Sequence, residues 1–154
     1  MDGFQAGVGK MSIKFYKLND IGGFMSNFYR STFKLYGRTW PTVEHAYQAQ
    51  KCIDNKEYNQ IHEAKTPRIA RNLGQEVKMR KDWDSVKRAV MKECCRAKFT
   101  QDEILKQELL NTGDQELIED SPVDWYWGCG ADGKGQNVLG QVLMEIRKEL
   151  KGTP

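Results

Sequence analysis

A regular apolar stripe in the middle of the chain most strongly constrains how it can fold. Asp82, a suitable N-cap residue, directly precedes the stripe. The spacing predicts an amphipathic α-helix with one buried face. Lysine and arginine side chains occupy the other face, which we interpret as solvated surface. The stripe consists, at intervals of 3, 4, 4 and 3 residues, of Trp83, Val86, Val90, Cys94 and Ala97.

Shorter segments on both sides of this helix predict a mixed architecture. Alternating apolar and polar residues indicate short strands at residues 12–17 and 33–36, and a further strand near Leu117. Gly37 turns the chain into residues 38–40, which are expected to end another strand. We expect the first forty residues to form one small, aromatic-rich sheet. The order of elements predicts an α+β fold, a mostly helical single domain with a small β-sheet. Further helices are expected at about residues 41–54, 56–64, 67–74, 100–112 and 137–151.

Capping residues suggest where several of these helices begin. Pro41 suits a first helical turn, and either Thr39 or Thr42 can cap it. Thr100 and Glu103 have the spacing of a capping box. These signals place the start of one helix near residue 41 and of another near residue 100.

Length and composition are those of a globular domain of 154 residues, with 39% hydrophobic and 29% charged residues. The first patterned segment starts after residue 11, so we expect a flexible N-terminal extension at 1–11 and a domain at 12–152. No secretory signal or apolar run of membrane-spanning length is present, which favours a cytoplasmic protein without a membrane partner. The net charge of +3 permits contact with phosphate but does not predict duplex DNA binding.

The four cysteines form no Cys-x-x-Cys pair, and the chain has only two histidines. We therefore expect reduced cysteines and neither a metal site nor a cofactor. None of the cysteines has a histidine or aspartate setting typical of a thiol nucleophile.

One predicted helix carries a polar face of three different functional groups. Glu44, Gln48 and Lys51 follow one another at i, i+4 and i+7, which puts a carboxylate, an amide and an ammonium on one side. This face can be ordinary solvent-exposed surface or the polar floor of a cleft. Trp40 and Tyr47 lie near enough in sequence to desolvate the Glu44 carboxylate.

The segment 120–137 combines four glycines and two tryptophans in one loop. Asp124 stands between apolar neighbours, which favours a functional role over simple solvation. Gly133-Lys134-Gly135 precedes a helix and is typical of a phosphate-binding turn, although it lacks the P-loop spacing. A flexible basic turn is the alternative interpretation of Lys134 and its neighbours.

Two carboxylates, several aromatic rings and a glycine–lysine loop suit cleavage of a C–N bond between a base and a sugar phosphate. Such a reaction passes through a transition state that resembles an oxocarbenium ion, which a carboxylate stabilises. Aromatic rings would stack on the base, and the lysine loop would hold phosphate.

The apolar stripe, taken alone, favours Trp83 as a core residue.

The chain resembles the NADAR family, also called YbiA-like or DUF1768 proteins. The resemblance covers about residues 13–150 and follows the family's order of motifs. Its most specific parts are Trp40-Pro41-Thr42-x-Glu44-His45 and Asp124-x-Tyr126-Trp127-Gly128 followed by Gly133-Lys134-Gly135-Gln136-Asn137. The remaining matches are Phe15-Tyr16, Phe24 to Phe28, Gln48 to Lys51, Arg80 to Trp83, Arg96 to Phe99 and Leu139-Gly140.

This resemblance implies a YbiA-like fold and N-glycosidase activity. The implied substrates are ribosylamino-pyrimidine phosphates of riboflavin synthesis, or ADP-ribose-modified guanine in nucleic acid. The family's key acidic residue falls on Glu44, its later aspartate on Asp124, and its tryptophan on Trp83, which the resemblance moves from core to site lining. Cys129 and Ala46 depart from the family pattern, and these departures bear on the exact substrate.

The site expected from the residues and the resemblance has Glu44 and Asp124 as catalytic groups. Lys51 is an alternative amine nucleophile that would form a Schiff base with the opened ribose. A hypothesis of another class is a non-catalytic nucleotide or ADP-ribose binding module with the same pocket. The expected substrate-binding residues are Asn27, Phe28, Trp83, Trp127, Gly128, Lys134 and Asn137.

Overall fold

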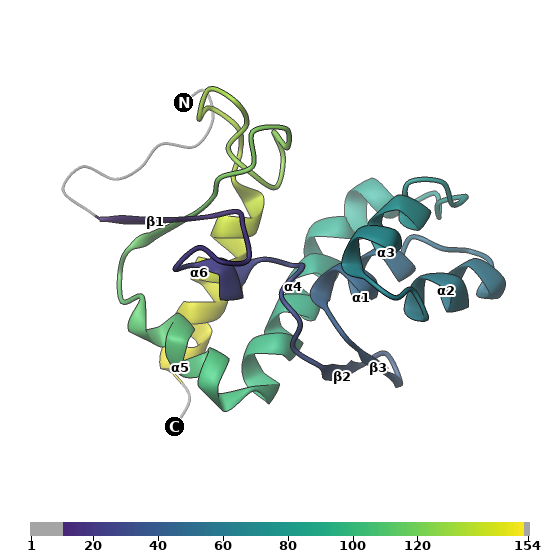
Figure 1. The fold of residues 1–154 in the computed structure, drawn as a ribbon, viewed down its shortest axis with the longest axis horizontal. Coiled ribbons are helices and arrows are strands. Elements are labelled where there is room, and N and C mark those ends of the chain that lie inside the picture. Colours follow the sequence, from purple (N-terminus) through teal and green to yellow (C-terminus); the bar gives the residue numbers. More distant parts are fainter. Residues whose placement is uncertain (1–10, 153–154) are drawn as a thin grey trace. The chain divides into compact units, whose positions relative to one another are not determined.

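The computed structural model describes residues 11–152, which form two compact units. One unit consists of residues 11–26 and 103–152, and the other of residues 27–102 (Figure 1). Residues 1–10 of the predicted N-terminal extension lie outside the described residues, and the domain limits at 12 and 152 stay predictions. Within residues 11–152, no helix combines the length and apolar character needed to cross a bilayer.

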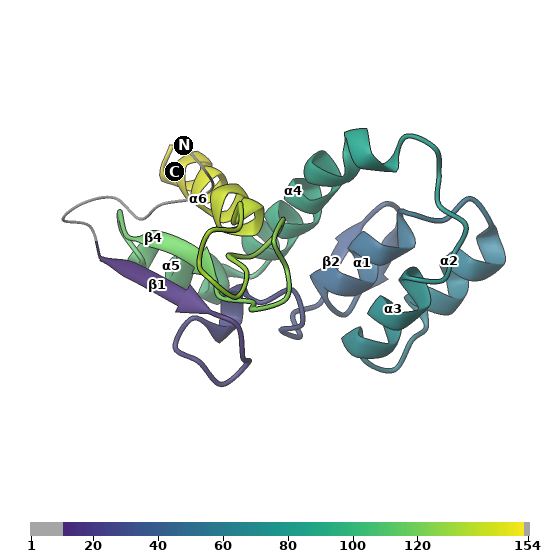
Figure 2. The same ribbon diagram turned by 90° about the horizontal axis from the view of Figure 1, so that it is seen from above.

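A parallel pair of strands forms the sheet of the first unit. β1 (Ser12–Phe15) and β4 (Glu116–Glu119) pair with Ser12 opposite Glu116 and Phe15 opposite Glu119. α6 (Val138–Lys151) packs against β4, and α5 (Glu103–Asn111) packs against α6 (Figure 2). A short 3-10 helix, η1 (Gly23–Met25), follows β1. Parallel pairing makes the loops after β1 and β4 leave the sheet at the same end.

The core of this unit lies between the sheet and α6. One face of α6 is apolar and buried, and it consists of Leu139, Leu143, Ile146 and Leu150. Gly113 ends the turn after α5 in the left-handed region, with a φ of 64°, which favours glycine. The most deeply buried side chains of the unit include Phe15, Leu109, Leu117, Leu139, Val142, Leu143 and Ile146.

A hairpin and four helices form the second unit. β2 (Phe33–Leu35) and β3 (Arg38–Trp40) are antiparallel, and Tyr36 and Gly37 connect them with positive φ angles of 54° and 73°. Two successive positive φ angles are typical of the tight turns that join twisted strands. The helices are α1 (Val43–Ala49), α2 (Asn55–His62), α3 (Pro67–Gly74) and α4 (Trp83–Gln101).

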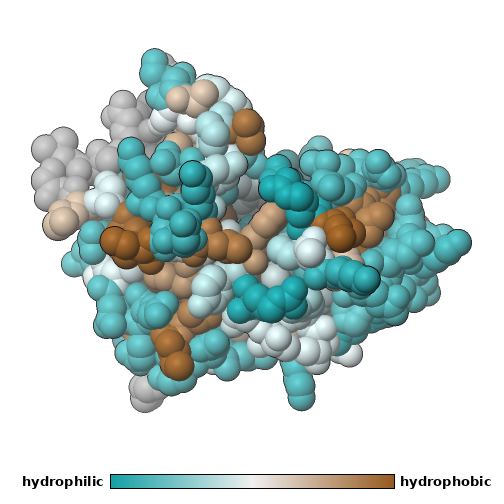
Figure 3. Space-filling model, in the orientation of Figure 1, coloured by the Kyte–Doolittle hydropathy of each residue, from teal (hydrophilic) through white to brown (hydrophobic). Residues whose placement is uncertain are grey.

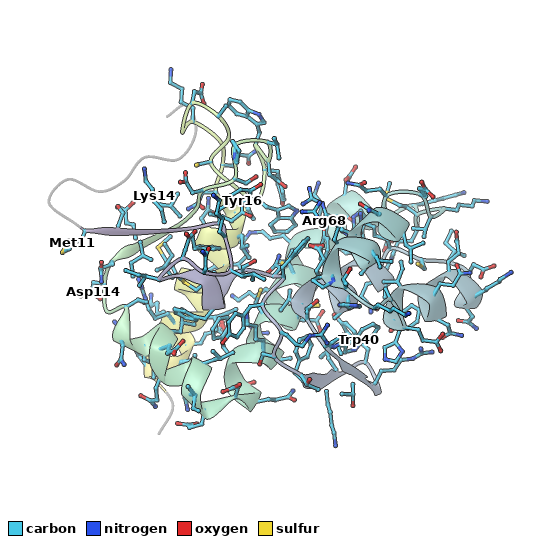
Figure 4. The ribbon with its side chains drawn as sticks, viewed as in Figure 1. Met11, Lys14, Tyr16, Trp40, Arg68 and Asp114 are labelled. Carbon is cyan, nitrogen blue, oxygen red and sulfur yellow. The ribbon has the colours of Figure 1, made fainter. Side chains whose placement is uncertain are left out.

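Trp40 connects the hairpin to the helices of its unit (Figure 4). Its side chain is fully buried, and its indole Nε1 donates a hydrogen bond to the Leu35 carbonyl at 2.8 Å. The rings of Tyr58 and His62 from α2 contact it edge-on, with centroids 5.7 and 4.8 Å away. Trp40, which directly precedes Pro41, therefore fixes where the chain enters α1.

The predicted class, α+β and mostly helical, is confirmed, but the single sheet expected in the first forty residues is wrong. β1 pairs with β4, whereas β2 and β3 pair only with each other. Alternation of apolar residues identifies strands but does not select their partners. The partner of β1 lies far along the chain, in the strand β4 against which α6 packs.

Two predictions about helix starts need correction, and a third, for Asp82, is confirmed in position but without a capping hydrogen bond. Pro41 precedes the N-cap Thr42 instead of lying in the first turn, and α1 ends at Ala49, earlier than expected. Thr100 is inside α4 and donates to the Arg96 carbonyl at 2.7 Å, so it forms no capping box. Asp82 holds the N-cap position of α4, but its carboxylate pairs with Arg80 at 2.6 and 2.9 Å.

Apolar side chains on the surface form separate patches among polar ones on the face shown in Figure 3. The most exposed are Ile21, Met11 and Ile104, with 98%, 74% and 73% of their surface accessible. Scattered exposed apolar residues are ordinary on globular proteins and assign no function.

Candidate active site

A buried threonine–histidine pair fixes the start of α1. Thr42 Oγ1 accepts a hydrogen bond from the His45 backbone N–H at 3.2 Å and lies 2.7 Å from His45 Nδ1. His45 Nε2 lies 2.9 Å from the Ala64 carbonyl oxygen, which can only accept. Neutral His45 therefore carries its proton on Nε2, and Nδ1 accepts from the Thr42 hydroxyl. Burial lowers the pKa of His45, which favours this neutral form.

Glu44 lies in the first turn of α1 with its side chain buried, only 7% exposed. Its backbone N–H donates to the Asn27 carbonyl at 3.1 Å, which ties the turn to the segment after η1. Its Oε2 accepts a hydrogen bond from Gln48 Nε2 at 3.0 Å. Burial of a carboxylate is costly unless polar partners stabilise it, so this setting differs from that of a solvated surface residue.

Gln48 and Lys51, which share the polar face with Glu44, differ in burial. The sequence alone did not decide whether they lie on the surface or in a cleft. Gln48 is buried, with 5% of its surface exposed, so the surface interpretation is wrong for it. Lys51 follows the end of α1 and is half-buried. Its Nζ lies 5.9 Å from the centroid of the Tyr47 ring, within reach of a cation–π interaction.

The electrostatic surroundings of Lys51 bring together charges from three helices of the unit. Burial lowers the pKa of its ammonium below the usual value. The Glu44 carboxylate opposes this shift, whereas the positive charges of Arg71 and Lys87 add to it. A lysine with a lowered pKa is more often neutral near pH 7, which an amine nucleophile requires.

Trp83, the first residue of α4, is buried and packs against α1. Its ring centroid lies 5.2 Å from that of Tyr47, with a tilt of 56° between the rings. Tyr47 is one turn from both Glu44 and Lys51, so Trp83 belongs to the same part of the unit. Burial agrees with the core interpretation from the apolar stripe, and the role in lining the site stays a prediction.

Asn27 and Phe28 lie half-buried at the beginning of the second unit. The side chain of Asn27 contacts two sulfur atoms of α4, with Nδ2 3.5 Å from Met91 Sδ and Oδ1 3.9 Å from Cys95 Sγ. The guanidinium of Arg68 in α3 lies 6.0 Å from the Phe28 ring centroid. Asn27 thus positions the Glu44 backbone, and its own side chain is held by α4.

The remaining predicted residues lie in the first unit, in the loop between β4 and α6. Asp124 organises this loop: its Oδ1 accepts hydrogen bonds from the backbone N–H groups of Tyr126 and Trp127 at 3.0 and 2.7 Å. The Ser121 hydroxyl accepts the Asp124 backbone N–H at 3.2 Å. Trp127 is half-buried, and its ring meets that of Tyr126 edge-on at 4.8 Å. Asp124 therefore has a structural task whether or not it contacts substrate.

Gly128 and Asn137 close the loop onto the strand β4. A Cβ atom at Gly128 would approach Glu119 Oε2 to 2.2 Å and the backbone carbonyl oxygens of Asp124 and Glu119 to 3.0 Å, so a larger residue would have to displace its neighbours. The Gly128 carbonyl accepts the Asn137 backbone N–H at 2.9 Å. Asn137 is fully buried, and its side chain accepts from the Glu119 N–H and donates to the Leu117 carbonyl. Both ends of this amide are thus occupied by the backbone of β4.

Lys134 is exposed at the tip of the loop. Its backbone N–H donates to Asp132 Oδ1 at 2.9 Å, and Gly133 has a φ of 77°. This geometry fits both the phosphate-binding and the basic-turn interpretations. Cys129, which departs from the family pattern, belongs to the same loop. Its thiol donates a hydrogen bond to Asp120 Oδ1 at 3.4 Å.

The predicted residues thus form two groups, one in each unit. Within residues 27–102, contacts bring Asn27, Glu44 and the Lys51–Trp83 neighbourhood together. Within residues 103–152, the loop holds its own predicted residues. The sequence did not reveal that Gly74 contacts Gln48, although the i, i+4 spacing from Glu44 already marked Gln48. In the part of the chain that the structure describes, no group of three or more His, Cys, Asp or Glu side chains has a metal-binding arrangement.

Comparison with known proteins gives consistent matches over nearly the whole chain. A family model described as "NADAR domain" matches residues 14–151. N-glycosidase YbiA of Escherichia coli (strain K12) is 44% identical over 140 residues, which cover 90% of this chain and 88% of that protein. An NMR structure of the E. coli protein YbiA matches with a TM-score of 0.85 and 40% identity, over 98% of this chain and 89% of that chain. The predicted YbiA-like fold is therefore confirmed.

A longer relative carries a different name. The riboflavin biosynthesis protein VVA0006 of Vibrio vulnificus (strain YJ016) is 40% identical over 141 residues. The match covers 90% of this chain but 38% of that protein, so this chain corresponds to one part of it.

Proposed function

Because the chain belongs to the NADAR family, we propose that it is an N-glycosidase that hydrolyses the C–N bond between a base or amino-pyrimidine and a ribose phosphate or ADP-ribose. The observation that carries the proposal is the buried Glu44 carboxylate, which belongs to a motif of the family and accepts a hydrogen bond from Gln48, while the Asn27 carbonyl accepts the Glu44 backbone N–H. A desolvated carboxylate gains little for binding alone but stabilises a developing cation strongly.

In the proposed mechanism, Glu44 stabilises positive charge on C1′ as the C–N bond breaks. Water supplies a hydroxyl group to C1′, and its proton ends on the leaving nitrogen. Asp124 orients the ribose hydroxyls or assists this proton transfer. Trp83 and Trp127 would form walls against the base and the sugar, as aromatic rings stack on either.

The other predicted residues would bind the polar and apolar parts of the substrate. Asn27 and Lys134 would contact sugar or phosphate oxygens, and Phe28 would pack against the base. The backbone at Gly128 would approach the substrate closely. Asn137 has both ends of its amide bonded to β4, so its contribution is best explained by the shape that it gives the loop.

Lys51 offers a second route to the same products. Its neutral amine would attack C1′ of the ring-opened sugar and release the base as an amine, and water would then hydrolyse the lysine imine. The lowered pKa of Lys51 supports this route. Borohydride reduction during turnover, followed by peptide mass mapping, distinguishes the two routes: an adduct on Lys51 supports the imine, and no lysine adduct eliminates it.

We favour a ribosylamino-pyrimidine phosphate of riboflavin synthesis as the substrate, and the name of one relative, a riboflavin biosynthesis protein, supports this choice. ADP-ribosylated guanine in DNA is the second candidate. Incubation of the protein with each substrate, followed by identification of the released base and sugar, tests the proposal. Release from the pyrimidine substrate alone supports the metabolic role. Binding of either substrate without release indicates a binding module instead of an enzyme.

A further inference from the structure

A buried carboxamide lies directly against the proposed catalytic carboxylate. Gln48 follows Glu44 by one helical turn in α1, and its Nε2 donates a hydrogen bond to Glu44 Oε2 at 3.0 Å. The side chain of Gln48 is 5% exposed. A hydrogen bond donated to a carboxylate favours its ionised form and fixes its orientation.

The other end of the same amide lacks a donor. Gln48 Oε1 is buried and accepts no hydrogen bond from any residue in the described range 11–152. An unsatisfied buried acceptor costs stability, and a side chain selected only for packing would avoid that cost. Turning the amide over would place an oxygen against the Glu44 carboxylate. The orientation of Gln48 therefore follows from the needs of Glu44.

Gly74, the last residue of α3, makes room for this orientation. A Cβ atom there would lie 2.0 Å from Gln48 Oε1 and 2.7 Å from its Cδ. Gly74 is helical, so its backbone conformation does not itself require glycine. The glycine is needed because the carboxamide of Gln48 occupies the space of its missing side chain.

We propose that Gln48 is a positioning residue, seated against Gly74, which orients the Glu44 carboxylate and keeps it ionised for glycosidic bond cleavage. The inference rests on the proposed function, in which Glu44 stabilises the cationic sugar. It adds a role for Gln48 and for Gly74 that the motif residues alone do not assign.

Other ionisable groups also face Glu44 from the elements packed around it. Lys51 lies beyond the end of α1, and Cys94 and Cys95 belong to α4. Burial raises the pKa of both thiols, so they are neutral near pH 7, whereas the Lys51 ammonium favours the ionised carboxylate. Replacing Gln48 with methionine removes the hydrogen bond without changing the net charge of this cluster.

The test compares steady-state kinetics of the full chain on a ribosylamino-pyrimidine phosphate and on ADP-ribosylated guanosine DNA. Gln48→Met is expected to lower kcat by about 10-fold or more through misplacement of the carboxylate, with KM within about twofold. The acidic limb of the kcat–pH profile should move to higher pH. Gly74→Ala, which displaces the carboxamide, should have the same effects. Gln50→Met is the matched control, because the Gln50 amide bonds the Ala46 carbonyl and the Tyr58 hydroxyl instead.

Thermal unfolding of each variant separates positioning from folding. If Gln48→Met does not fold, the nearly isosteric Gln48→Glu carries the test, with the same expected loss of kcat and a larger shift of the acidic limb. If a folded Gln48 variant keeps the wild-type kcat and pH profile while Glu44→Gln is inactive, the inference about Gln48 is overturned and the proposed function stands. If Glu44→Gln retains full activity, or if the wild type releases no product, the proposed function fails and the inference falls with it.

Discussion

The side-chain amide of Asn137 donates a hydrogen bond to the backbone carbonyl of Leu117 at 2.9 Å, while its oxygen accepts the Glu119 N–H at the same distance. A residue expected to bind substrate thus joins the glycine-rich loop to the strand β4. Its own backbone has a φ of 53°, in the left-handed region that asparagine tolerates better than most residues.

Asn137→Ala is therefore expected to destabilise the protein. It leaves two buried backbone groups without partners, at a cost of about 1–3 kcal/mol each in the free energy of unfolding. Urea denaturation measures the change. Gln136→Ala, at the exposed neighbouring position, is the control and should stay near the wild-type value. An Asn137→Ala protein of wild-type stability with weakened substrate binding would instead assign the residue to the substrate.

Thr42→Ala is expected to lower the free energy of unfolding by about 1–2 kcal/mol, because it removes the N-cap of α1. It also removes the hydroxyl that His45 Nδ1 contacts at 2.7 Å. Thr39→Ala is the natural control, since Thr39 is exposed and caps no helix. Chemical denaturation of both variants measures the difference, and an equal effect of the two substitutions would contradict the capping role.

Asp124→Asn separates the loop-building and catalytic roles of Asp124. The asparagine oxygen can still accept the backbone N–H groups of Tyr126 and Trp127, but the charge is lost. We expect stability close to that of the wild type and a loss of turnover of about 100-fold, as for a group that handles a proton. Asp124→Ala should lose both turnover and loop order. Full turnover in the asparagine variant would restrict Asp124 to its structural role.

Lys98 gives the protein a specific pH dependence of stability. It is fully buried between the rings of Tyr29 and Phe99, and burial lowers its pKa to about 8. The folded protein therefore releases this proton at lower pH than the unfolded chain, in which lysine has its usual pKa of 10.5. Stability from this group rises between these two pH values, since the unfolded state binds more protons there.

Lys98→Met is accordingly expected to raise the free energy of unfolding at pH 7 by about 1–3 kcal/mol, because it removes a buried charge. The gain should shrink as the pH approaches 10. Lys92→Met on the same helix is the control. Denaturation curves between pH 7 and 10 measure the difference between variant and wild type, and a gain that does not change with pH would contradict the account of Lys98.

Local sequence signals predicted much of the fold. The helix expected at residues 67–74 is present as α3, and the apolar stripe that starts at Trp83 identified α4. The partner of β1 was not predictable, because strand pairing depends on what other elements cover each strand. The Thr100 signal failed because α4 continues through that residue, so its hydroxyl bonds back to the preceding turn.

The sequence identified which residues belong to the candidate site better than it predicted the burial and contacts of their side chains. Glu44 stood out from its place in a helix and from the family motifs, and it is buried in the structure. Whether Gln48 was surface or cleft could not be read from its spacing, because its burial depends on Gly74 of another helix. The bonds of Asn137 to β4 were equally hidden, since they join residues from separate elements.

The most direct test of the central claim is the rate of base release by Glu44→Gln under single-turnover conditions, with ribosylamino-pyrimidine phosphate and ADP-ribosylated guanosine DNA in parallel. Glu63→Gln, at an exposed position of the same unit, serves as the matched control. The account predicts that Glu63→Gln releases the base at the wild-type rate, whereas Glu44→Gln binds the substrate and is slower by about 100-fold or more. Equal rates for Glu44→Gln and the wild type would contradict it.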